Sequence, residues 1–436
     1  MKAIPAVLAA LALAFAASVA SAAGTTSAVV HKPSADVHGA ADLKSPTVAT
    51  LKRNASVDVT GQQGLWFKVA LPAGQAGFMR VNDVRMASAA KGPPASALGA
   101  LFGGKAGSGR TTETAGVRGL DESTLKAAGF DGAQLAKMES YRATPDAAAA
   151  FARNQHWAAA KVAYPDELQP GARGGATQAE KRGGLAVARG LLGGLLGGVG
   201  SDAVEMADAS MGKSEDEMAA EELELGPQIA GRILGAAPLW DDPDAQRRVN
   251  LIGRWMASQT SRPDLPWTFG VIDSGEVNAF AAPGGYVLVT RGLYQLLADD
   301  AEVAAVLGHE IGHVVQRDHY NVIRKQMMSG TGIDIAASHV NVGGGLAGSL
   351  VKDYMREHGA AVMATSLDRG AEYHADHASA IYLARSGSSP LALYGVLQKM
   401  SAVGTKSPEV AQLYRTHPPL DQRMDRLDRD PIAMKQ

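Results

Sequence analysis

Two histidines and a glutamate stand close together in the segment His309-Glu310-Ile311-Gly312-His313. Residues four apart lie on the same face of an α-helix, so His309 and His313 can bind one metal ion. Glu310 can then reach the water that attacks the substrate. This HExxH spacing is typical of zinc-dependent hydrolases. We therefore expect one Zn²⁺ per chain, bound by His309 and His313, with Glu310 as the catalytic base.

A catalytic zinc needs a third protein ligand and one open position. The chain contains no cysteine, so this ligand must be a histidine or a carboxylate. Glu372 is the best candidate, because Asp376 follows it on the same face of a helix expected over 367–383. We expect Asp376 to accept a hydrogen bond from the outer nitrogen of His309 and so to fix the tautomer of that ring.

The other histidines near these motifs are expected to be exposed or hydrogen-bonded rather than metal ligands. They are His319, His339, His358, His374 and His377. At about 100° per residue, His374 and His377 point about 200° and 140° away from Glu372 on their helix. Neither is therefore expected to share its metal.

The metal motif needs a rigid, packed element to hold it. Asp299 and Asp300 predict where its helix begins, since carboxylates complement the positive end of the helix dipole. An apolar stripe predicts the buried face of this helix. The stripe consists of Val303, Leu307, Ile311 and Val314. The Gly-rich stretch 329–349 is interpreted as a mobile flap over the cleft.

Three short runs upstream of this helix predict strands. Residues 267–271 and 277–280 are expected to pair, with 284–289 as the next strand. Asn278, Ala279 and Phe280 would then form an edge strand in the cleft. Such a strand binds an extended substrate through its main chain, which gives modest sequence selectivity.

These residues belong to a longer set of specific motifs. The set contains Asn278-Ala279-Phe280-Ala281, Pro283-Gly284-Gly285-Tyr286, Thr290-Arg291-Gly292-Leu293, the His309 to His313 motif, Glu372 with Ala375-Asp376, and Thr416-His417-Pro418-Pro419 with Arg423. Over about residues 217–428 it resembles the zinc metallopeptidases of family M48, in particular their BepA-like periplasmic branch. The resemblance implies a zincin-like fold, endopeptidase activity, zinc bound by His309, His313 and Glu372, and Glu310 as the base. Tyr373-His374 departs from the residues that the family often has beside the third ligand.

The C-terminal loop supplies two further catalytic candidates, His417 and Arg423. The tetrahedral intermediate of peptide hydrolysis needs a hydrogen-bond donor opposite the metal, and either side chain can provide one. His417 has a second role to consider. As a neutral imidazole beside the zinc, it could take the water's position and hold the enzyme latent until it is displaced.

The N-terminal residues predict an exported protein with a small β domain. Residues 1–22 combine a basic start, an apolar run and a small-residue end, which favours a cleaved signal peptide over a membrane anchor. Residues 25–86 alternate β-rich runs with turn-formers, which predicts a barrel with strands over 47–51, 56–60, 66–71 and 77–81. The barrel resembles bacterial SH3-like domains, which implies a peptidoglycan or peptide ligand. The alternative is a purely structural barrel with Trp66 and Phe78 in its core.

Composition divides the rest of the chain. Residues 87–110 are interpreted as a linker, 111–168 as a small helical segment, 169–215 as a Gly-rich linker and 216–430 as the metallopeptidase domain. The many glycines of the second linker argue against a transmembrane span, and peripheral membrane or partner contact is the alternative to simple flexibility. The predicted fold class is α+β: a mainly helical, zincin-like metallopeptidase domain with a small sheet, preceded by a small all-β SH3-like barrel.

Charge and cysteine content narrow the function classes. The 42 Lys and Arg residues nearly balance 44 Asp and Glu residues, so no nucleic-acid partner is expected. Export without disulfides or a lipidated cysteine indicates a periplasmic or secreted protein. One reading is a zinc endopeptidase that degrades unfolded or misfolded envelope proteins, in envelope quality control. The other is a chaperone-like or cell-wall-binding or peptide-binding protein with little proteolysis. The full set of catalytic residue types favours the enzyme.

Overall fold

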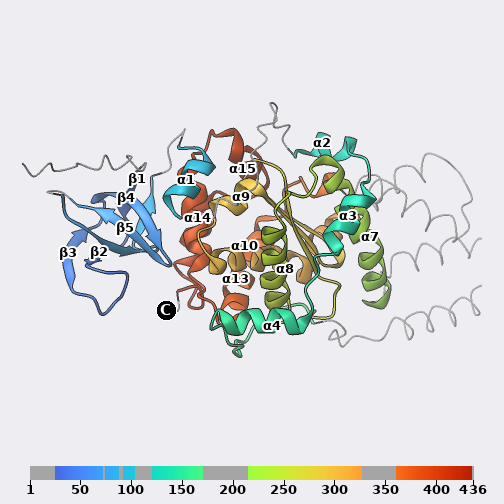
Figure 1. Cartoon of the computed structure of the whole chain (residues 1–436), viewed down its shortest axis with the longest axis horizontal. Coiled ribbons are helices and arrows are strands. Elements are labelled where there is room, and N and C mark those ends of the chain that lie inside the picture. The colour runs from blue at the N-terminus through green and yellow to red at the C-terminus, as the bar shows by residue number, and fades with distance from the viewer. Residues whose placement is uncertain are drawn as a thin grey trace, which may run out of the picture.

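The computed structural model describes residues 25–71, 74–87, 92–103, 120–169, 215–326 and 360–434. The expected signal peptide, most of the Gly-rich linker and the expected flap lie outside these residues. An all-β N-terminal part lies beside a mostly helical part that contains a second, smaller sheet (Figure 1). This arrangement confirms the predicted α+β class. Among the described residues, no helix is both long and apolar enough to cross a membrane.

The N-terminal part is a seven-stranded antiparallel sheet in the order β3-β2-β6-β5-β4-β1-β7. Its strands are β1 (Thr26–Val30), β2 (Ser34–His38), β3 (Thr47–Lys52), β4 (Ser56–Gln63), β5 (Trp66–Ala70), β6 (Ala76–Arg80) and β7 (Val84–Met86). The four strands predicted from the sequence are confirmed as β3 to β6. Along β4 and β5, alternate residues such as Val57, Val59 and Val69 are buried, as the two-residue period of a strand requires. The described residues contain no ladder between the end strands β3 and β7.

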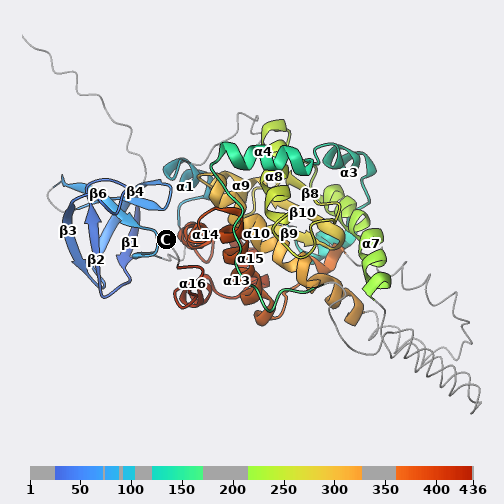
Figure 2. The ribbon, with the colours of Figure 1, turned by 90° about the horizontal axis from the view of Figure 1, so that it is seen from below.

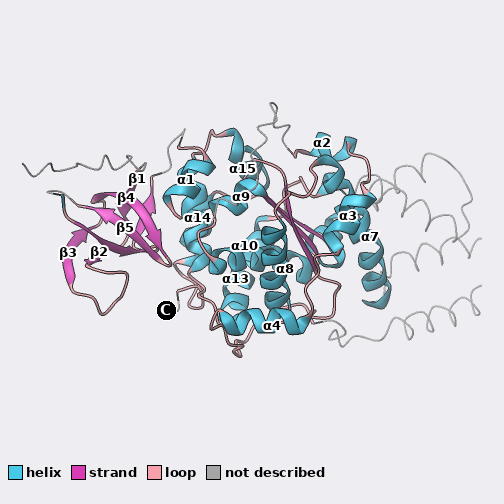
Figure 3. Ribbon diagram, viewed as in Figure 1, coloured by secondary structure: helices cyan, strands magenta, loops and turns pink. Residues whose placement is uncertain are grey.

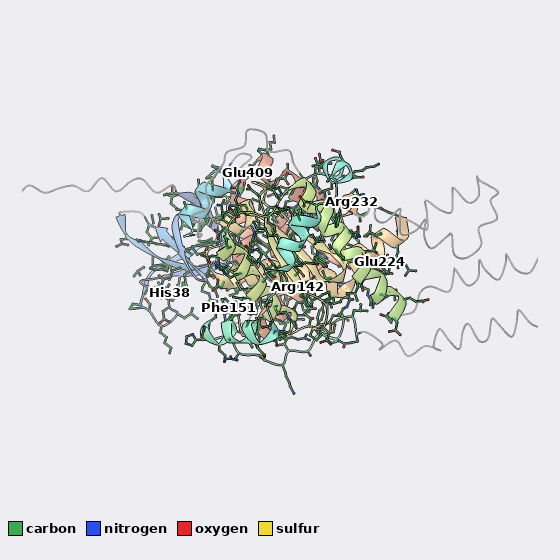
Figure 4. All side chains as sticks on the ribbon, turned by 45° about the vertical axis from the view of Figure 1, so that its right-hand side comes forward. His38, Arg142, Phe151, Glu224, Arg232 and Glu409 are labelled. Atoms are coloured by element: carbon green, nitrogen blue, oxygen red, sulfur yellow. The ribbon has the colours of Figure 1, made fainter. Side chains whose placement is uncertain are left out.

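Trp66 lies inside this sheet's packing and is only 7% exposed. The His38 ring, labelled in Figure 4, meets it edge-on with 5.3 Å between ring centroids. The Arg80 guanidinium lies 5.4 Å from its centroid, a cation–π contact. Phe78 is half-buried. Trp66 is therefore already covered by the chain's own side chains.

The helical part contains most of the remaining elements (Figure 3). Its helices are α1 (Ala95–Leu101), α2 (Glu122–Ala127), α3 (Gly132–Glu139), α4 (Pro145–Asn154), α7 (Glu215–Ala236), α8 (Pro243–Ala257), α9 (Arg291–Leu296), α10 (Asp300–Gln316), α13 (Arg369–Ser386), α14 (Ala392–Val403), α15 (Ala411–Thr416) and α16 (Leu420–Leu427), with short 3₁₀ turns η2 (Pro283–Gly285) and η3 (Pro408–Val410). Helix α10 carries the metal motif and lies between α8, α13 and α14. Its central place makes it the rigid element that the motif requires.

The small sheet has the order β8-β10-β9, with β8 (Thr268–Ile272), β9 (Ala279–Ala282) and β10 (Tyr286–Thr290). The predicted direct pairing of the first two strands is wrong, because β10 lies between them, parallel to β8 and antiparallel to β9. Every residue of β10 is buried, which suits a central strand covered on both faces. Gly284 and Gly285 have φ values of 73° and 94° and allow the tight turn from β9 to β10. Strand β9 is therefore left at the edge.

Helices α1 to α4 pack against the metallopeptidase elements. Helices α2 and α3 contact α7, and α4 contacts α8. Arg142, which follows α3 and is labelled in Figure 4, donates hydrogen bonds to the hydroxyls of Thr268 and Tyr286 at 2.5 and 2.9 Å. Helix α1 lies within the stretch interpreted as a linker. It packs on α9 and α14, and its first amide, at Ala95, donates to the Glu409 carboxylate at 2.9 Å.

The N-terminal sheet is docked on the helical part through α14 and α16, and the two lie side by side in Figures 1 and 2. The buried amide of Gln398 accepts from the Met86 N–H at 2.8 Å and donates to the Val81 carbonyl at 3.2 Å. Arg85 donates to Asp428 at 2.7 Å. Apolar residues of both parts belong to one continuous core cluster. The sheet is thus built into the helical part by a buried polar and apolar interface.

We predict that Gln398→Leu lowers the free energy of unfolding by about 1–3 kcal/mol. The apolar side chain fills similar space but leaves backbone groups around β7 buried without partners. The measurement is urea denaturation followed by circular dichroism. Gln422→Leu on the exposed surface of α16 is the control and should change the midpoint little. Equal stability of the Gln398 variant and the parent would contradict a buried polar interface.

Candidate metal centre

Helix α10 begins at a strong cap, because the Asp299 carboxylate accepts from the Glu302 N–H at 3.0 Å. All residues from Glu302 to Val315 are buried, so this helix is covered on every side rather than along the single predicted stripe. Gly308 and Gly312 let α13 approach closely. A Cβ at Gly308 would lie 3.1 Å from Ser379 Oγ, and one at Gly312 would lie 3.1 Å from Ala378 Cβ. The close approach brings the side chains of α13 to the histidines of α10.

The three predicted ligands converge on one point. His309 Nε2 and His313 Nε2 lie 3.2 Å apart. The two Glu372 oxygens each lie 3.7 Å from one of these nitrogens. All three side chains are at most 6% exposed. Two nitrogens bound to one tetrahedral zinc, at about 2.0–2.1 Å each, are roughly 3.3 Å apart.

Each histidine has a carboxylate on its outer nitrogen. His309 Nδ1 lies 3.0 Å from Asp376 Oδ1, and His313 Nδ1 lies 2.8 Å from Asp318 Oδ2. A proton on each Nδ1 leaves both Nε2 atoms as acceptors, with their lone pairs facing each other at close range. A cation between them removes this repulsion. The donor set of two imidazoles and one carboxylate therefore fits a zinc ion, and it is the set found in catalytic zinc sites with one open position.

Asp318 was not among the residues found from the sequence. It follows the end of α10, where Arg317 adopts a left-handed conformation with φ 62°. That turn brings Asp318 back to the ring of His313, five residues earlier. The signal in the sequence was a carboxylate just beyond the helix end, but nothing in the sequence shows where the turn falls.

Burial and neighbouring charges shift the pKa values of the centre in opposite directions, and burial prevails at His309, whose pKa is lowered. Burial alone would lower the pKa of His313, but the hydrogen bond to Asp318 and the charge of Glu372 raise it to about 9. Burial alone would raise the pKa of Glu372, but the charges of His417, His313 and His309 hold it well below its usual value. Burial alone would also raise the pKa of Asp376, but the charge of Arg423 outweighs burial and lowers this pKa to about 2.

Arg423 acts on the centre through Asp376. Its Nε and Nη2 donate to the two Asp376 oxygens at 2.9 and 2.6 Å, and the side chain is 4% exposed. From the sequence, Arg423 is a candidate hydrogen-bond donor to the tetrahedral intermediate. These contacts favour a positioning role, since Arg423 fixes Asp376 and Asp376 fixes the ring of His309.

His417 lies directly against the ligand carboxylate. Its Nδ1 is 2.5 Å from Glu372 Oε2, and its ring centroid is 6.1 Å from that of His309. His309, Glu372 and His417 can together offer three ligand atoms to one ion. The backbone N–H of His417 donates to the Leu413 carbonyl at 2.9 Å, which anchors the loop after α15.

Glu310 lies between two hollows of the surface. The first is lined by His309 and the second by His313, and Asn278, Ala279, Glu310 and His417 line both. The hollows therefore form one cleft along the start of β9, with Glu310 at its middle. Phe280 lines neither hollow. Its side chain is 1% exposed and belongs to the same apolar core as residues of α7 and β10. Successive side chains of a strand point to opposite faces, so Phe280 points away from the cleft that Ala279 lines. The predicted contact of Phe280 with the substrate is made by the main chain of the edge strand, does not involve this side chain, and stays a prediction.

The other histidines differ in their surroundings. His374 is exposed, and His377 binds Asp430. His319 is 8% exposed, lines the second hollow and packs against the His313 ring at 5.7 Å between centroids. Burial, followed by the charge of His313, lowers the pKa of His319 to about 3. His339 and His358 lie outside the described residues.

One other group of potential ligands occurs in the described part of the chain: His31, Asp425 and Asp428. Arg85 already neutralises it, with Nη2 at 3.0 Å from Asp425 and 2.7 Å from Asp428. A guanidinium in the middle of the group takes the place that a cation would need. This cluster is therefore a junction between the sheet and α16 rather than a second metal site.

Comparison with known proteins places this centre in a family. The family model for peptidase family M48 matches residues 243–430, which contain every residue of the centre. The protease HtpX homolog of Kineococcus radiotolerans is 31% identical over 210 residues, which make up 39% of this chain and 69% of that protein. The chain belongs to peptidase family M48.

Members of the family with other names are also similar. The beta-barrel assembly-enhancing protease of Yersinia pestis is 28% identical over 213 residues, and that of Escherichia coli K12 is 27% identical over the same length. These matches cover 47% of this chain and 42% of each relative, so the chain spans less than half the length of these relatives. Family M48 membership identifies the 243–430 region as a metallopeptidase domain.

We predict that Asp318→Ala weakens zinc binding about 10–100-fold, because His313 loses the partner that fixes its tautomer. Competition with a chromophoric chelator measures the affinity. Asp58→Ala, which removes an exposed carboxylate of the N-terminal sheet, is the matched control and should bind zinc as the parent does. An unchanged affinity in the Asp318 variant would remove Asp318 from the centre.

Proposed function

We propose that the protein is a zinc-dependent endopeptidase of the bacterial cell envelope that hydrolyses misfolded or exported proteins. The observation that carries the proposal is the position of Glu310. It lies on the ligand-bearing helix, beside the converging His309, His313 and Glu372, and in the middle of a cleft bordered by an edge strand. A general base in this position serves attack by water on an extended peptide.

His309, His313 and Glu372 would hold the zinc. When bound, the ion polarises the scissile carbonyl and lowers the pKa of water. Glu310 takes a proton from the attacking water and delivers it to the leaving amine. Strand β9 aligns the substrate backbone, with Asn278 and Ala279 at the cleft. Asp376, Asp318 and Arg423 keep the two imidazole rings oriented.

We infer that His417 holds the centre latent. Its ring can offer a ligand atom to the same ion as His309 and Glu372, which supports the role of an imidazole that takes the position of the attacking water. Movement of the loop after α15 would open that position.

The envelope location and the substrates are inferred from the N-terminal residues and from the names of similar proteins. The N-terminal residues 1–22 have the pattern of a signal peptide. Similar proteins carry the name beta-barrel assembly-enhancing protease, which states that those proteins act in the assembly of β-barrels. The N-terminal sheet is compatible with an SH3-like domain and with a peptidoglycan or peptide ligand. A chaperone-like or envelope-binding protein with little proteolysis is the second candidate, and the edge strand β9 would serve it equally well.

We predict that Glu310→Gln lowers the rate of casein cleavage by about 10²–10⁴-fold, because the amide cannot accept the proton. Zinc content, measured by atomic absorption on the same sample, should not change, since Glu310 is not a ligand. Glu122→Gln, at an exposed position of α2, is the control for the substitution itself. Cleavage by the Glu310 variant at the parent's rate would refute the proposed chemistry, and zinc without any cleavage by the parent would favour the binding role.

We predict that His417→Ala increases kcat/KM for a quenched peptide, because removal of the imidazole opens the position of the attacking water. The fold increase in kcat/KM should equal the inverse of the fraction of the parent enzyme that is not blocked by His417. Steady-state fluorescence measures it, with zinc content as the check on loading. A fall in kcat with zinc retained would identify His417 as a transition-state donor instead.

A further inference from the structure

Hydrogen bonding alternates along β9, so its residues divide into two sets. The Thr290 N–H donates to the Asn278 carbonyl at 3.0 Å, which makes these two residues a hydrogen-bonded pair that extends the antiparallel ladder of β9 and β10. Since such pairs alternate with non-bonded pairs, the even-numbered residues of β9 direct their N–H and C=O toward β10. The backbone groups of Val277, Ala279 and Ala281 therefore point to the opposite, free edge. Helix α10 lies next to this strand (Figure 2).

The chain itself already occupies both ends of this free edge. The Val277 N–H donates to the Glu409 carbonyl of η3 at 2.8 Å. At the other end, the buried imidazole of His319 forms a hydrogen bond with the Ala281 backbone. This bond by itself raises the pKa of the ring, so the ring N–H is the donor and the Ala281 carbonyl is the acceptor.

Ala279 lies between these two ends. It lines both hollows of the cleft, as Glu310 does. Within the part of the chain that the structure describes, its N–H and C=O have no hydrogen-bond partner. One backbone donor and one backbone acceptor of the edge strand are thus available beside the catalytic base.

We propose that His319 and Glu409 restrict the pairing of a substrate to Ala279, which makes His319 a specificity-determining residue. This inference rests on the proposed peptidase function. Residues two apart on a strand are separated by about 7 Å. A substrate strand paired with Ala279 would therefore meet Glu409 two residues to one side and His319 two residues to the other. The main-chain contact predicted for the edge strand would then be made by Ala279.

Such a short pairing selects flexible chains. The substrate must bend away from the edge on both sides of the paired residue. A segment that is fixed in a long β-strand cannot do so, whereas an unfolded segment can. The substrate class is therefore an unfolded polypeptide that offers one free N–H and one free C=O beside the bond that is cut, with few demands on its side chains.

An ester scan tests the pairing directly, because replacing one backbone amide of a peptide by an ester removes one N–H. Affinity is measured by fluorescence anisotropy on the full, zinc-loaded chain that carries Glu310→Gln, so that the esters are not cut. We expect one ester position to weaken binding about 5–100-fold, because the Ala279 carbonyl loses its donor. Esters two residues to either side should have little effect.

Substitution of His319 in the same background should lengthen the pairing. His319→Ala frees the Ala281 carbonyl, so a second sensitive amide should appear two residues from the first. His319→Gln carries an N–H that can donate to that carbonyl and should keep the single sensitive amide. His374→Ala, at an exposed position of α13, is the matched control and should also keep it. Zinc content is measured for each variant, because His319 packs against the ring of His313.

Two results would overturn the restricted pairing and leave the peptidase standing. One is a row of sensitive amides at every second residue while His319 is unchanged. The other is a zinc-loaded His319→Ala variant without a second sensitive amide. The scan with His319 unchanged tests the proposal even when a variant fails to fold or to bind zinc. Cleavage that Glu310→Gln does not reduce would instead overturn the proposed function itself.

Discussion

The centre depends on the close approach of α10 and α13. Gly308 and Gly312 stand one turn apart on α10, opposite Ala375, Ala378 and Ser379 of α13. Any Cβ at the glycines would meet α13 at 3.1 Å, which is tighter than an ordinary van der Waals contact. Glycine in a helix costs about 1 kcal/mol relative to alanine. The two glycines therefore destabilise α10 but allow α13 to pack close to it. That proximity is what brings Glu372 and Asp376 to histidines from a segment about sixty residues earlier.

Buried ion pairs fix the far end of α10. Arg317 takes a left-handed conformation that is unfavourable for a residue with a Cβ. Its guanidinium donates to Glu222 of α7 at 2.8 Å, and the fully buried Glu222 also binds Arg262 at 2.6 Å. Removing one partner from such a network leaves an unpaired buried charge, which costs about 3–5 kcal/mol. The network therefore holds the turn that places Asp318 on His313.

The sequence was sufficient for features set by local spacing. The HExxH spacing predicted the two imidazoles, and the spacing of Glu372 and Asp376 predicted a shared helix face. Features set by the tertiary fold were missed. Asp318 reaches His313 only because Arg317 turns the chain, and β10 lies between β8 and β9 because it is buried on both faces. The docking of the N-terminal sheet depends on contacts between residues that are far apart in sequence, such as Met86 with Gln398 and Gln62 with Glu302. No local sequence pattern predicts such contacts.

The central claim is that one metal ion lies between His309 Nε2, His313 Nε2 and Glu372. The most direct test is a crystal structure of the zinc-loaded protein with anomalous diffraction recorded on both sides of the zinc absorption edge. The account predicts one strong zinc peak about 2.0–2.1 Å from both imidazole nitrogens and a similar distance from a Glu372 oxygen. A peak elsewhere, such as at His31 and Asp428, with none beside His309 and His313 would contradict it.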